Sequence, residues 1–329
     1  MNKNLVFILF ILWSHQSVAQ IELTINARQL TPMKLSEISE QSHCVALNID
    51  SVSQVIATDR FLFASRGGNM RNHLFQFDFS GKLIRTFEAK SGFSEFICDI
   101  ENKRIVIPYS REATVWDFNG SFLKKIQIPE NSSVIGFAGN NIWMVQNMKE
   151  SDDKIRCRIV CVNYENEHQE IILERIFPVF TIMNAIISYK AWFSSARGRL
   201  YTGFHENIFY EIDGKDVRPA FIYNIENYKE DYFDYAVHEK MVAGRFFTIK
   251  YGSFADTKLF WYDTKEKKTW QMQMNYGKGG IVDDIYYTGN CDYYKINGNY
   301  LIFRKNKENL PKGMKIDGGF VFFIIKLKQ

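Results

Sequence analysis

The chain has 329 residues, with 41 basic and 37 acidic side chains and a formal net charge of +4. This balance is too even to indicate a strongly anionic partner, so we do not expect the protein to bind nucleic acid or an anionic membrane surface. A chain of this length can bury a core that needs no covalent cross-links, either in one closed domain or in two ordinary ones.

Residues 1–19 have the pattern of a secretory signal peptide. Lys3 supplies the positive charge, residues 5–13 form a short apolar run, and Ser17-Val18-Ala19 fits a small-x-small cleavage site. The run is too short to cross a bilayer core of about 30 Å as a helix, and no later segment is long and apolar enough. We therefore predict a soluble periplasmic or extracellular protein without a membrane span, whose mature chain begins at Gln20.

The segment that follows the signal divides into two parts. Residues 20–43 are interpreted as an N-terminal extension, and residues 44–49 as a strand without a partner nearby in the sequence. Residues 44–329 are interpreted as a single domain, because the chain has only six prolines and no polar linker that would separate two domains.

A hairpin pattern occurs twice in the first half of the chain, at 74–84 and at 113–123. In each copy an apolar run reaches an aspartate, Asp78 or Asp117, then a turn that contains glycine, and then a second apolar run. Asn119-Gly120 predicts a type I′ turn, because both central residues of that turn need positive φ, which Asn and Gly tolerate best. The two aspartates lie about one four-stranded propeller blade apart.

Later segments continue the repeat in weaker form. Asn163, Asp213 and Asp263 mark three more hairpins, and a sixth unit has inner strands but no outer strand before the chain ends. Adding 44–49 to the strand at 319–327 would close the ring and remove an exposed sheet edge. The predicted blades are 52–90, 91–130, 131–178, 180–224, 232–275, and 279–329 completed by 44–49.

The predicted fold class is therefore all-β: a six-bladed β-propeller of four-stranded antiparallel blades, closed by an N-terminal strand. The aromatic content of 16% suits this architecture, because each blade is covered on both faces by its neighbours and needs bulky side chains at two interfaces. A helical alternative fails, since no long stretch keeps apolar residues at helical spacing.

Several of these segments together resemble a known family. The stretch at 35–40, the hairpin at 77–82 and the Trp116-Asp117 segment are similar to the NHL-like six-bladed β-propellers found in exported proteins of Bacteroidetes. That family joins its first two blades by a Gly-x-Gly-Pro-Gly-Glu-Phe/Tyr turn, which Gly92, Glu95 and Phe96 match, whereas Phe93 and Ser94 depart from it. The resemblance implies export and a binding or scaffold role near the outer membrane, and it carries over no catalytic residue.

Motifs of propeller enzymes are missing from the sequence. No Gly-x-Ser-x-Gly elbow and no His-Glu-x-x-His motif occurs. His205-Glu206 and His238-Glu239 lack a second histidine, and we interpret them as solvated polar residues. Asp283-Asp284 are neighbours that would point to opposite faces of a strand, which favours a turn role over a cation or acid–base site. The inner strands supply mostly apolar and small residues.

The repeated aspartates and the cysteines also have structural interpretations. Asp before a tight turn caps backbone NH groups, which we favour over calcium binding. Cys157 and Cys161 share a predicted strand, where four residues span about 13 Å, too far for a disulfide with its Cα atoms at most about 7 Å apart. We favour cysteines as core residues over a metal site, and the state of the other three, Cys44, Cys98 and Cys291, is left open.

The richest candidate surface is the segment 223–235, in which five aromatic residues alternate with four carboxylates. Flat rings beside carboxylates suit sugars, which offer CH groups for stacking and hydroxyls for hydrogen bonds. The proposed ligand-binding residues are Tyr228, Asp231, Tyr232 and Tyr235. The alternative is a connection whose aromatic rings pack on the blades. The basic stretch 304–315 is a solvated loop or a docking loop.

The sequence thus predicts an exported, monomeric, non-enzymatic propeller that binds a glycan, peptide or protein through loops between blades. It predicts no catalytic residue, no metal ligand and no cofactor. The alternative is a propeller hydrolase or lyase that acts on a polysaccharide at the central channel.

Overall fold

The computed structural model describes most of the chain after residue 19. The described residues are 20–66, 73–87, 93, 95–109, 111–179, 181, 182, 185, 186, 190–204, 206–213, 216–226, 237, 239–252, 256–275, 278–291, 294–305, 310, 311 and 319–329. The predicted signal peptide, 1–19, lies outside them. No helix among the described residues is long and apolar enough to cross a membrane.

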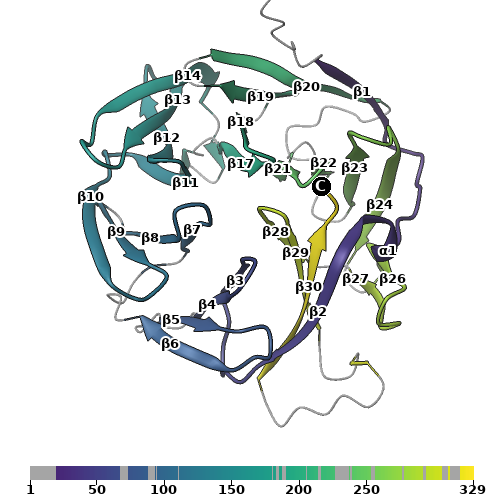
Figure 1. Cartoon of the computed structure of the whole chain (residues 1–329). Coiled ribbons are helices and arrows are strands. Elements are labelled where there is room, and N and C mark those ends of the chain that lie inside the picture. The colour runs from purple at the N-terminus through teal and green to yellow at the C-terminus, as the bar shows by residue number, and fades with distance from the viewer. Residues whose placement is uncertain are drawn as a thin grey trace, which may run out of the picture.

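The strands form a ring of six antiparallel four-stranded sheets, each with its first strand at the centre and its last at the rim (Figure 1). Blade 1 consists of β3(Gln54–Ala57), β4(Leu62–Arg66), β5(His73–Phe77) and β6(Leu83–Phe87). Blade 2 consists of β7(Ile97–Asp99), β8(Arg104–Pro108), β9(Glu112–Asp117) and β10(Phe122–Gln127). Blade 3 consists of β11(Ser132–Ala138), β12(Asn141–Lys149), β13(Lys154–Asn163) and β14(Gln169–Pro178).

The second half of the ring contains the longer connections and the added strands. Blade 4 consists of β17(Trp192–Ala196), β18(Arg199–Gly203), β19(Ile208–Asp213) and β20(Asp216–Glu226). Blade 5 consists of β21(Glu239–Ala243), β22(Phe246–Gly252), β23(Thr257–Asp263) and β24(Thr269–Asn275), extended by β25(Lys278–Gly279). Two small hairpins lie between blades, β15(Thr181–Ile182) with β16(Ala185–Ile186) and β26(Ile281–Asp283) with β27(Gly289–Cys291).

The ring is closed by a strand from the N-terminal side, as the sequence predicted. Blade 6 consists of β28(Tyr294–Asn297), β29(Tyr300–Lys305), β30(Phe320–Leu327) and, at its rim, β2(Ser39–Leu47). β2 pairs antiparallel with β30, from Ser39 opposite Leu327 to Leu47 opposite Phe320. The closing strand therefore begins and ends earlier than the predicted 44–49. The six-bladed, all-β fold class is confirmed.

The segment interpreted as an extension contains a second rim strand. β1(Ile21–Asn26) pairs in parallel with β20, so that blade 4 has five strands. Farther along, Thr31 bridges to Gln271 of β24, and Lys34 bridges to Val282 just before the single turn of helix α1(Leu35–Ile38). Residues 20–47, which we call the N-terminal arm, thus run along the rim of blades 4, 5 and 6 (Figure 1).

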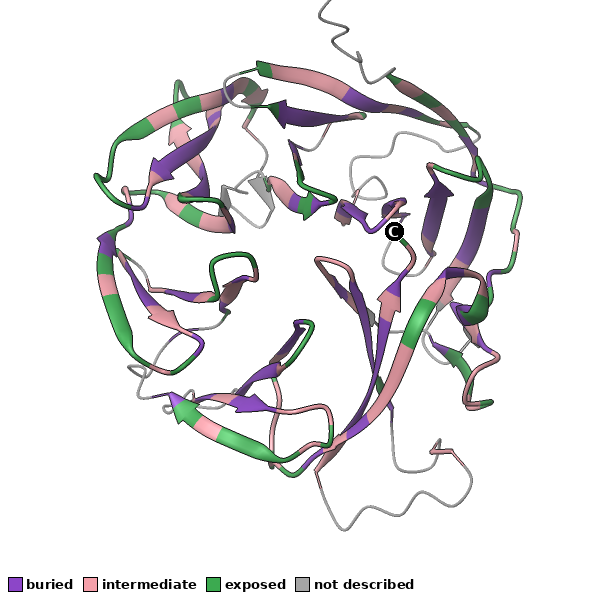
Figure 2. Ribbon diagram, viewed as in Figure 1, coloured by how far each residue is buried: buried purple, intermediate pink, exposed green. Residues whose placement is uncertain are grey.

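The core lies in the layers between neighbouring blades, and buried residues follow the inner and middle strands around the ring (Figure 2). Between blades 1 and 2, Phe63 lies 4.8 Å from Phe118 and is fully buried. Between blades 4 and 5, Phe221 and Phe247 stack with ring centroids 4.1 Å apart. Aromatic pairs of this kind fill both faces of a blade, as the composition predicted.

One predicted turn is wrong in detail. Of Asn119 and Gly120, only Gly120 has positive φ, at 82°, so the turn is not type I′. Gly120 donates its NH to the Asp117 carbonyl, and the strand register shifts between Phe122 and Lys124. This is a three-residue loop whose glycine forms a bulge, and it needs a left-handed conformation at only one residue.

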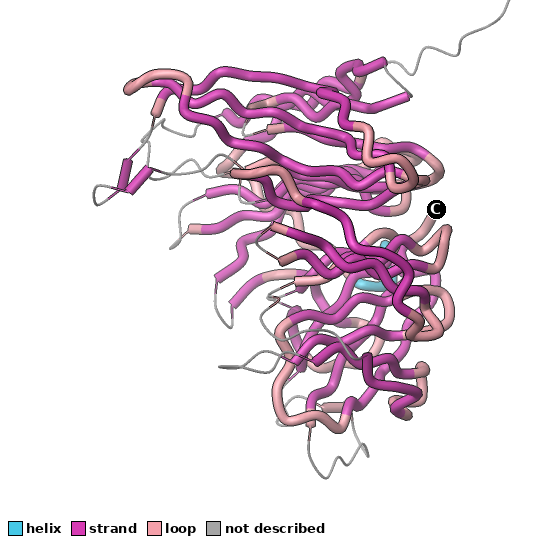
Figure 3. The backbone as a smooth tube through the Cα atoms, turned by 90° about the vertical axis from the view of Figure 1, so that its left-hand side faces the viewer, coloured by secondary structure: helices cyan, strands magenta, loops and turns pink. Residues whose placement is uncertain are grey.

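Antiparallel order places the connections on two opposite faces of the ring, which Figure 3 shows from the edge. On one face the first strand turns into the second and the third into the fourth, through tight turns such as 139–140 and 244–245. We call this the tight-turn face. On the other face the second strand joins the third and each blade joins the next. We call it the long-connection face, because it includes 179–191, 227–238, 276–293 and 306–319.

Candidate functional site

The predicted ligand-binding residues Tyr228, Asp231, Tyr232 and Tyr235 lie outside the described residues, so their binding role stays a prediction. They belong to the connection 227–238, whose neighbouring strand ends, Glu226 of β20 and Glu239 of β21, lie on the long-connection face. For Tyr223, at the start of the same aromatic segment, the packing alternative holds. Tyr223 is 2% exposed in β20 and belongs to the core between blades 4 and 5.

The connection 227–238 is anchored at both ends to one backbone oxygen. The Tyr223 hydroxyl on β20 donates to the carbonyl of Glu206 over 2.9 Å, and the Lys240 ammonium on β21 donates to the same carbonyl over 2.7 Å. Lys240 also donates to the Ile208 carbonyl over 2.6 Å. The strands on either side of the connection are therefore joined through the 204–207 connection of blade 4.

Lys240 is fully buried among aromatic rings. Its Nζ atom lies 5.4 Å from the ring centroid of Trp192, 5.5 Å from that of Phe209 and 5.8 Å from that of Tyr223. Ring faces attract a cation through their quadrupoles. A Cβ atom at Gly203 would lie 3.2 Å from Nζ, so a glycine leaves space for the ammonium. Three rings and two carbonyls thus form a closed cation site that the chain's own lysine occupies.

Burial dominates the electrostatics of this inner strand. It lowers the pKa of Lys240 to about 7, with the Glu206 carboxylate opposing the shift. On the preceding residue, burial raises the pKa of Glu239, opposed by the charges of Lys250 and Lys295. Neighbouring residues of a strand point to opposite faces, so Lys240 faces blade 4 and Glu239 lies toward blade 6. Opposed pKa shifts of this kind cluster at functional sites.

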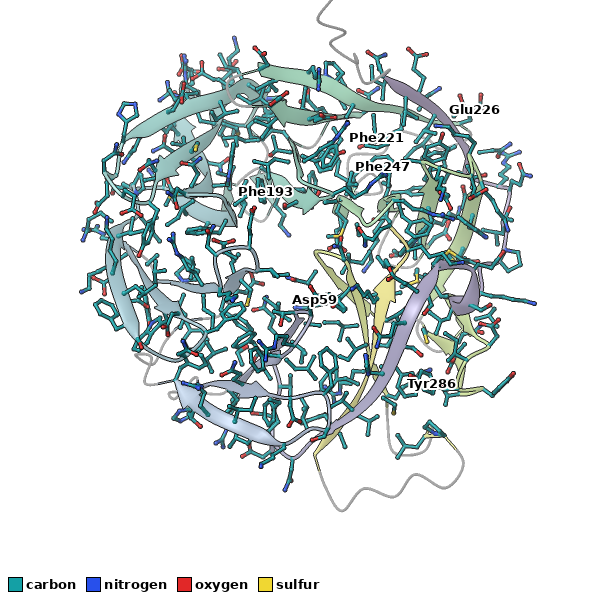
Figure 4. All side chains as sticks on the ribbon, viewed as in Figure 1. Asp59, Phe193, Phe221, Glu226, Phe247 and Tyr286 are labelled. Carbon is teal, nitrogen blue, oxygen red and sulfur yellow. The ribbon has the colours of Figure 1, made fainter. Side chains whose placement is uncertain are left out.

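Two clefts open between blades at the start of the ring. The first has a volume of about 130 Å³ and lies between blade 6 and blade 1 on the long-connection face, where Lys295 and Arg304 line it. The second has a volume of about 490 Å³ and lies between blades 1 and 2 on the tight-turn face. Asp59 in the turn after β3 lines the second cleft and lies near the ring centre (Figure 4). Its carboxylate accepts hydrogen bonds from Tyr300 and Lys326.

The turn aspartates have the capping role that the sequence predicted. Asp78 accepts hydrogen bonds from the backbone NH groups of Ser80 and Lys82. Asp117 accepts one from Ser121, and Asp263 accepts two from the residues that follow it. The carboxylates of Asp78 and Asp117 thus cap their own turns, and that of Asp263 caps its turn and also pairs with Arg245. Within the described part of the chain, no three His, Cys, Asp or Glu side chains gather closely enough to hold a metal ion.

Asp283 and Asp284 do not share one site, as predicted. Asp283 accepts hydrogen bonds from the backbone NH groups of Ile285, Tyr286 and Thr288. Asp284 instead accepts hydrogen bonds from the backbone and the hydroxyl of Ser36 in the N-terminal arm. Asp283 therefore caps a turn of its own connection, and Asp284 joins that connection to the arm.

All five cysteines are free thiols, in agreement with the prediction that Cys157 and Cys161 do not bond to each other. Both lie on β13 in the layer between blades 3 and 4. Burial raises the pKa of Cys157 to about 12 and that of Cys161 to about 11. Neither is a reactive thiolate at neutral pH.

Sequence reasoning missed the Lys240 site. The inner strands were expected to supply mostly apolar and small residues, but β21 contributes Glu239 and Lys240, and β28 contributes Lys295. The sequence held one weak signal. Lys240 and Val242 are two residues apart in a short strand, so a lysine shares a strand face with an apolar residue. Of the two His-Glu pairs, the structure describes Glu206 and Glu239, while His205 and His238 lie outside the described residues.

The chain is similar to solved propellers at low sequence identity. A protein of Bacteroides fragilis described as exported aligns with a TM-score of 0.57 and 11% identity, over 94% of this chain and 99% of that one. The WD40 domain of Pan2 from Neurospora crassa aligns with a TM-score of 0.45 and 12% identity, over 91% and 100% of the two chains. No protein-family model and no curated protein sequence matches the chain. The first similarity shows the propeller fold alone.

Proposed function

We propose that this chain is an exported, non-enzymatic binding or scaffold propeller that recognises a glycan, peptide or protein through its long-connection face. The single observation that carries the proposal is the double anchoring of the 227–238 connection by Tyr223 and Lys240 to the carbonyl of Glu206. A buried lysine is costly to keep, and this one fixes the base of the connection that carries Tyr228 and Tyr232. Binding residues on loops that a rigid scaffold positions are the common arrangement.

The two faces of the ring also differ in what they offer a ligand. The turns of the tight-turn face are short, and the longest span no more than 164–168 or 264–268. The long-connection face carries 179–191, 227–238 and 306–319, which contain aromatic, acidic and basic residues. Only the second face has segments long enough to form a ligand-specific surface of their own.

Export and family membership are parts of the same proposal. Cleavage after Ala19 would leave Gln20 next to β1, which begins at Ile21 and forms part of blade 4. The mature chain would therefore start at the rim of the folded ring. N-terminal sequencing of exported protein tests the cleavage, and a mature chain that retains residues 1–19 would reject it. We also propose that the chain is related to the NHL-like exported propellers of Bacteroidetes that its sequence resembles.

The test is a glycan and peptide array probed with the mature protein, followed by the double variant Tyr228→Ala with Tyr232→Ala. We expect the variant to lose binding of the selected ligand while its melting temperature stays within a few degrees of wild type. Phe122→Ala is the matched control, because Phe122 is an aromatic residue 53% exposed at the rim of blade 2, away from this face. A large fall in melting temperature with unchanged affinity would show that the tyrosines are packing residues.

A second candidate function is a polysaccharide hydrolase or lyase at the central channel. The observation that favours it is Glu239 on the inner strand β21, a carboxyl whose pKa is raised by burial, as in a general acid. Turnover assays on every glycan that the array selects, repeated with Glu239→Gln, decide between the two. Turnover that disappears in this variant would replace the binding proposal with an enzymatic one.

A further inference from the structure

The cleft between blades 6 and 1 is bordered by two cations over an apolar floor. Lys295 and Arg304 come from blade 6, and the segment 52–55 of blade 1 forms the opposite wall. The floor consists of Ile302 and Phe322, which are each about 5% exposed. Its volume of about 130 Å³ suits one functional group of a larger ligand rather than a whole ligand.

Strand register places both cations on one face of blade 6. Lys295 on β28 is opposite Ile302 on β29, and Arg304 lies two residues farther along β29, opposite Phe322 of β30. Residues two apart on a strand share a face, and such diagonal neighbours have Cβ atoms about 7–8 Å apart or less. Long side chains at that separation can reach one anion together.

Neither cation forms an ion pair with a carboxylate of the described residues. The Arg304 guanidinium instead lies over the ring of Phe320, 4.3 Å from its centroid, a contact that orients the planar fork. Glu239 is the acid whose charge interacts with Lys295, and burial raises the pKa of Glu239. Lys295 thus interacts with Glu239 only beyond ion-pair distance, and both cations remain available to an external anion.

Of the two neutral polar side chains that line the cleft, Ser53 and Gln54, the second is already engaged. The Gln54 amide donates to the carbonyl of Phe96 over 3.1 Å and accepts from its NH over 2.9 Å. Asp50, in the connection before β3, forms an ion pair with Arg66. The free hydrogen-bonding capacity of the cleft is therefore dominated by donors with positive charge.

We propose that this cleft binds the carboxylate of an acidic sugar, so that the ligand of the long-connection face is a glycan that contains uronate. This inference rests on the proposed function and narrows its ligand class. A carboxylate matches the planar fork of Arg304 and a second contact from Lys295. The CH face of the same sugar ring would lie against Ile302 and Phe322.

The test is calorimetric titration of the mature protein with three probes. The first is a tetrasaccharide that contains glucuronate, the second its neutral counterpart with glucose in place of glucuronate, and the third a glutamate-rich peptide of equal charge. We expect the acidic tetrasaccharide to bind at least about tenfold more tightly than the other two, because charge-assisted hydrogen bonds to the carboxylate are lost in the neutral sugar.

Variants test the two named side chains. Lys295→Met and Arg304→Met should each weaken binding of the acidic tetrasaccharide about tenfold, and their combination about a hundredfold. Arg304→Lys retains the charge and should recover part of the loss, which keeps the test valid if the methionine variants fold poorly. The matched control is Arg60→Met with Lys103→Met, which removes two cations from the blade 1–2 cleft on the opposite face and should leave affinity unchanged.

Each contrary result has a distinct meaning. Equal affinity for the acidic and neutral sugars, or an equal loss in the control variant, would overturn the carboxylate site. Tighter binding of the peptide would replace the glycan with an acidic protein segment and reject this inference. Absence of binding to all three probes, with an array ligand of another class found, would reject the inference and leave the proposed function standing. Absence of any array ligand would reject both.

Discussion

Blades 1–3 and blades 4–6 have the same sheet topology but differ in how their rims are covered. The N-terminal arm pairs with β20 of blade 4 and β30 of blade 6 and bridges to blade 5. In the other three blades, the rim strands β6, β10 and β14 pair only with the third strand of their own blade, and no described strand pairs with their outer edges. We call these two regions the covered half and the open half.

The open half exposes more large apolar side chains than the covered half, in which Leu30 and Tyr287 are the exposed ones among the described residues. Of the large hydrophobic residues that are exposed in the described chain, most lie on β6, β10 and β14: Leu83, Ile84, Phe122, Leu123, Ile171 and Ile176. In the arm, by contrast, Ile25, Met33, Leu35 and Val45 are at most 1% exposed. The arm therefore adds a layer of core to the covered half that the open half lacks.

The covered half also contains the fully buried lysine, Lys240, and a buried ion pair. Arg245 and Asp263 are 2.6 Å apart, with side chains 11% and 1% exposed. The open half instead exposes its larger ion network, since Arg156 and Arg158 pair with Glu174 near the surface. Buried charges need many fixed partners, and the extra layer of the covered half supplies them. The comparison suggests that the arm provides rigidity around the proposed binding face.

Removing the arm should have the largest effect. A chain that begins at Asp50 lacks β1, α1 and β2, so it exposes the edges of β20 and β30 and loses closure of the ring. We expect a loss of more than about 5 kcal/mol in unfolding free energy, enough to unfold a typical domain at 25 °C. Thermal unfolding followed by circular dichroism measures it.

The control for that truncation is a chain that begins at Gln20 but lacks Lys328 and Gln329. Lys328 accepts a backbone hydrogen bond from Arg245 and donates one to Ile38, so this trim should lower the midpoint by only a few degrees. Equal midpoints for the two truncations would show that the arm is not needed for closure.

Lys240 should make stability depend on pH in the covered half. Its pKa is about 7 in the folded protein and about 10.4 when unfolded, so between these values the unfolded chain binds one proton more. The unfolding free energy must therefore rise with pH across that window. Lys240→Met removes this contribution to the pH dependence. We expect wild type to gain about 2 kcal/mol relative to the variant between pH 7 and pH 9, measured by urea unfolding. If the unfolding free energies of wild type and Lys240→Met differ by the same amount at pH 7 and pH 9, Lys240 keeps its proton in the folded protein.

A glycine at the seam between the two halves should be sensitive to enlargement. A Cβ atom at Gly136 of β11 would lie 1.9 Å from the ring of Phe193 in β17. Gly136→Ala should therefore cost about 1–3 kcal/mol through overpacking. Gly139→Ala serves as control, because nothing lies within 4 Å of its Cβ and only its positive φ opposes the change. Chemical denaturation of both should give the larger loss at 136, and the reverse order would contradict close packing at the seam.

Exposed residues of the open rim should matter least for stability. Leu83→Ser and Phe122→Ser change side chains that are 47% and 53% exposed, so unfolding free energy should change by no more than about 0.5 kcal/mol. The same substitutions should reduce self-association at high concentration, as light scattering would measure. A loss of several kcal/mol would mean that these side chains pack as the buried residues of the arm do.

The fold was predictable because its signals are local. Hairpins in which glycine follows aspartate by three residues mark blades 1 and 2. An unpaired strand near the beginning of the chain matches a missing strand at its end, and this predicted the pairing of β2 with β30 within a few residues. The parallel pairing of β1 with β20 was not predictable in this way. Ile21, Leu23 and Ile25 alternate as a strand does, but nothing in that alternation selects a partner two hundred residues away.

The candidate site was less predictable than the fold. Tyr223 and Lys240 meet at the Glu206 carbonyl only because three segments from two blades converge there. Every residue has a backbone carbonyl, so the sequence does not indicate which one accepts these hydrogen bonds. Lys295 and Arg304 read as ordinary surface charges until the register of β28 and β29 places them on one face. Sites formed by residues that are distant in the sequence can be recognised only once the structure shows which residues are neighbours.

The central claim is that ligand binds on the long-connection face. Amide hydrogen exchange of the mature protein, with and without the ligand that the array selects, tests it most directly, because the two faces consist of different peptides. The account predicts that exchange slows in 204–208, 227–243 and 294–305 and stays unchanged in the tight turns at 58–61 and 100–103. Slower exchange confined to those tight turns, or to the open rim at β10 and β14, would contradict it.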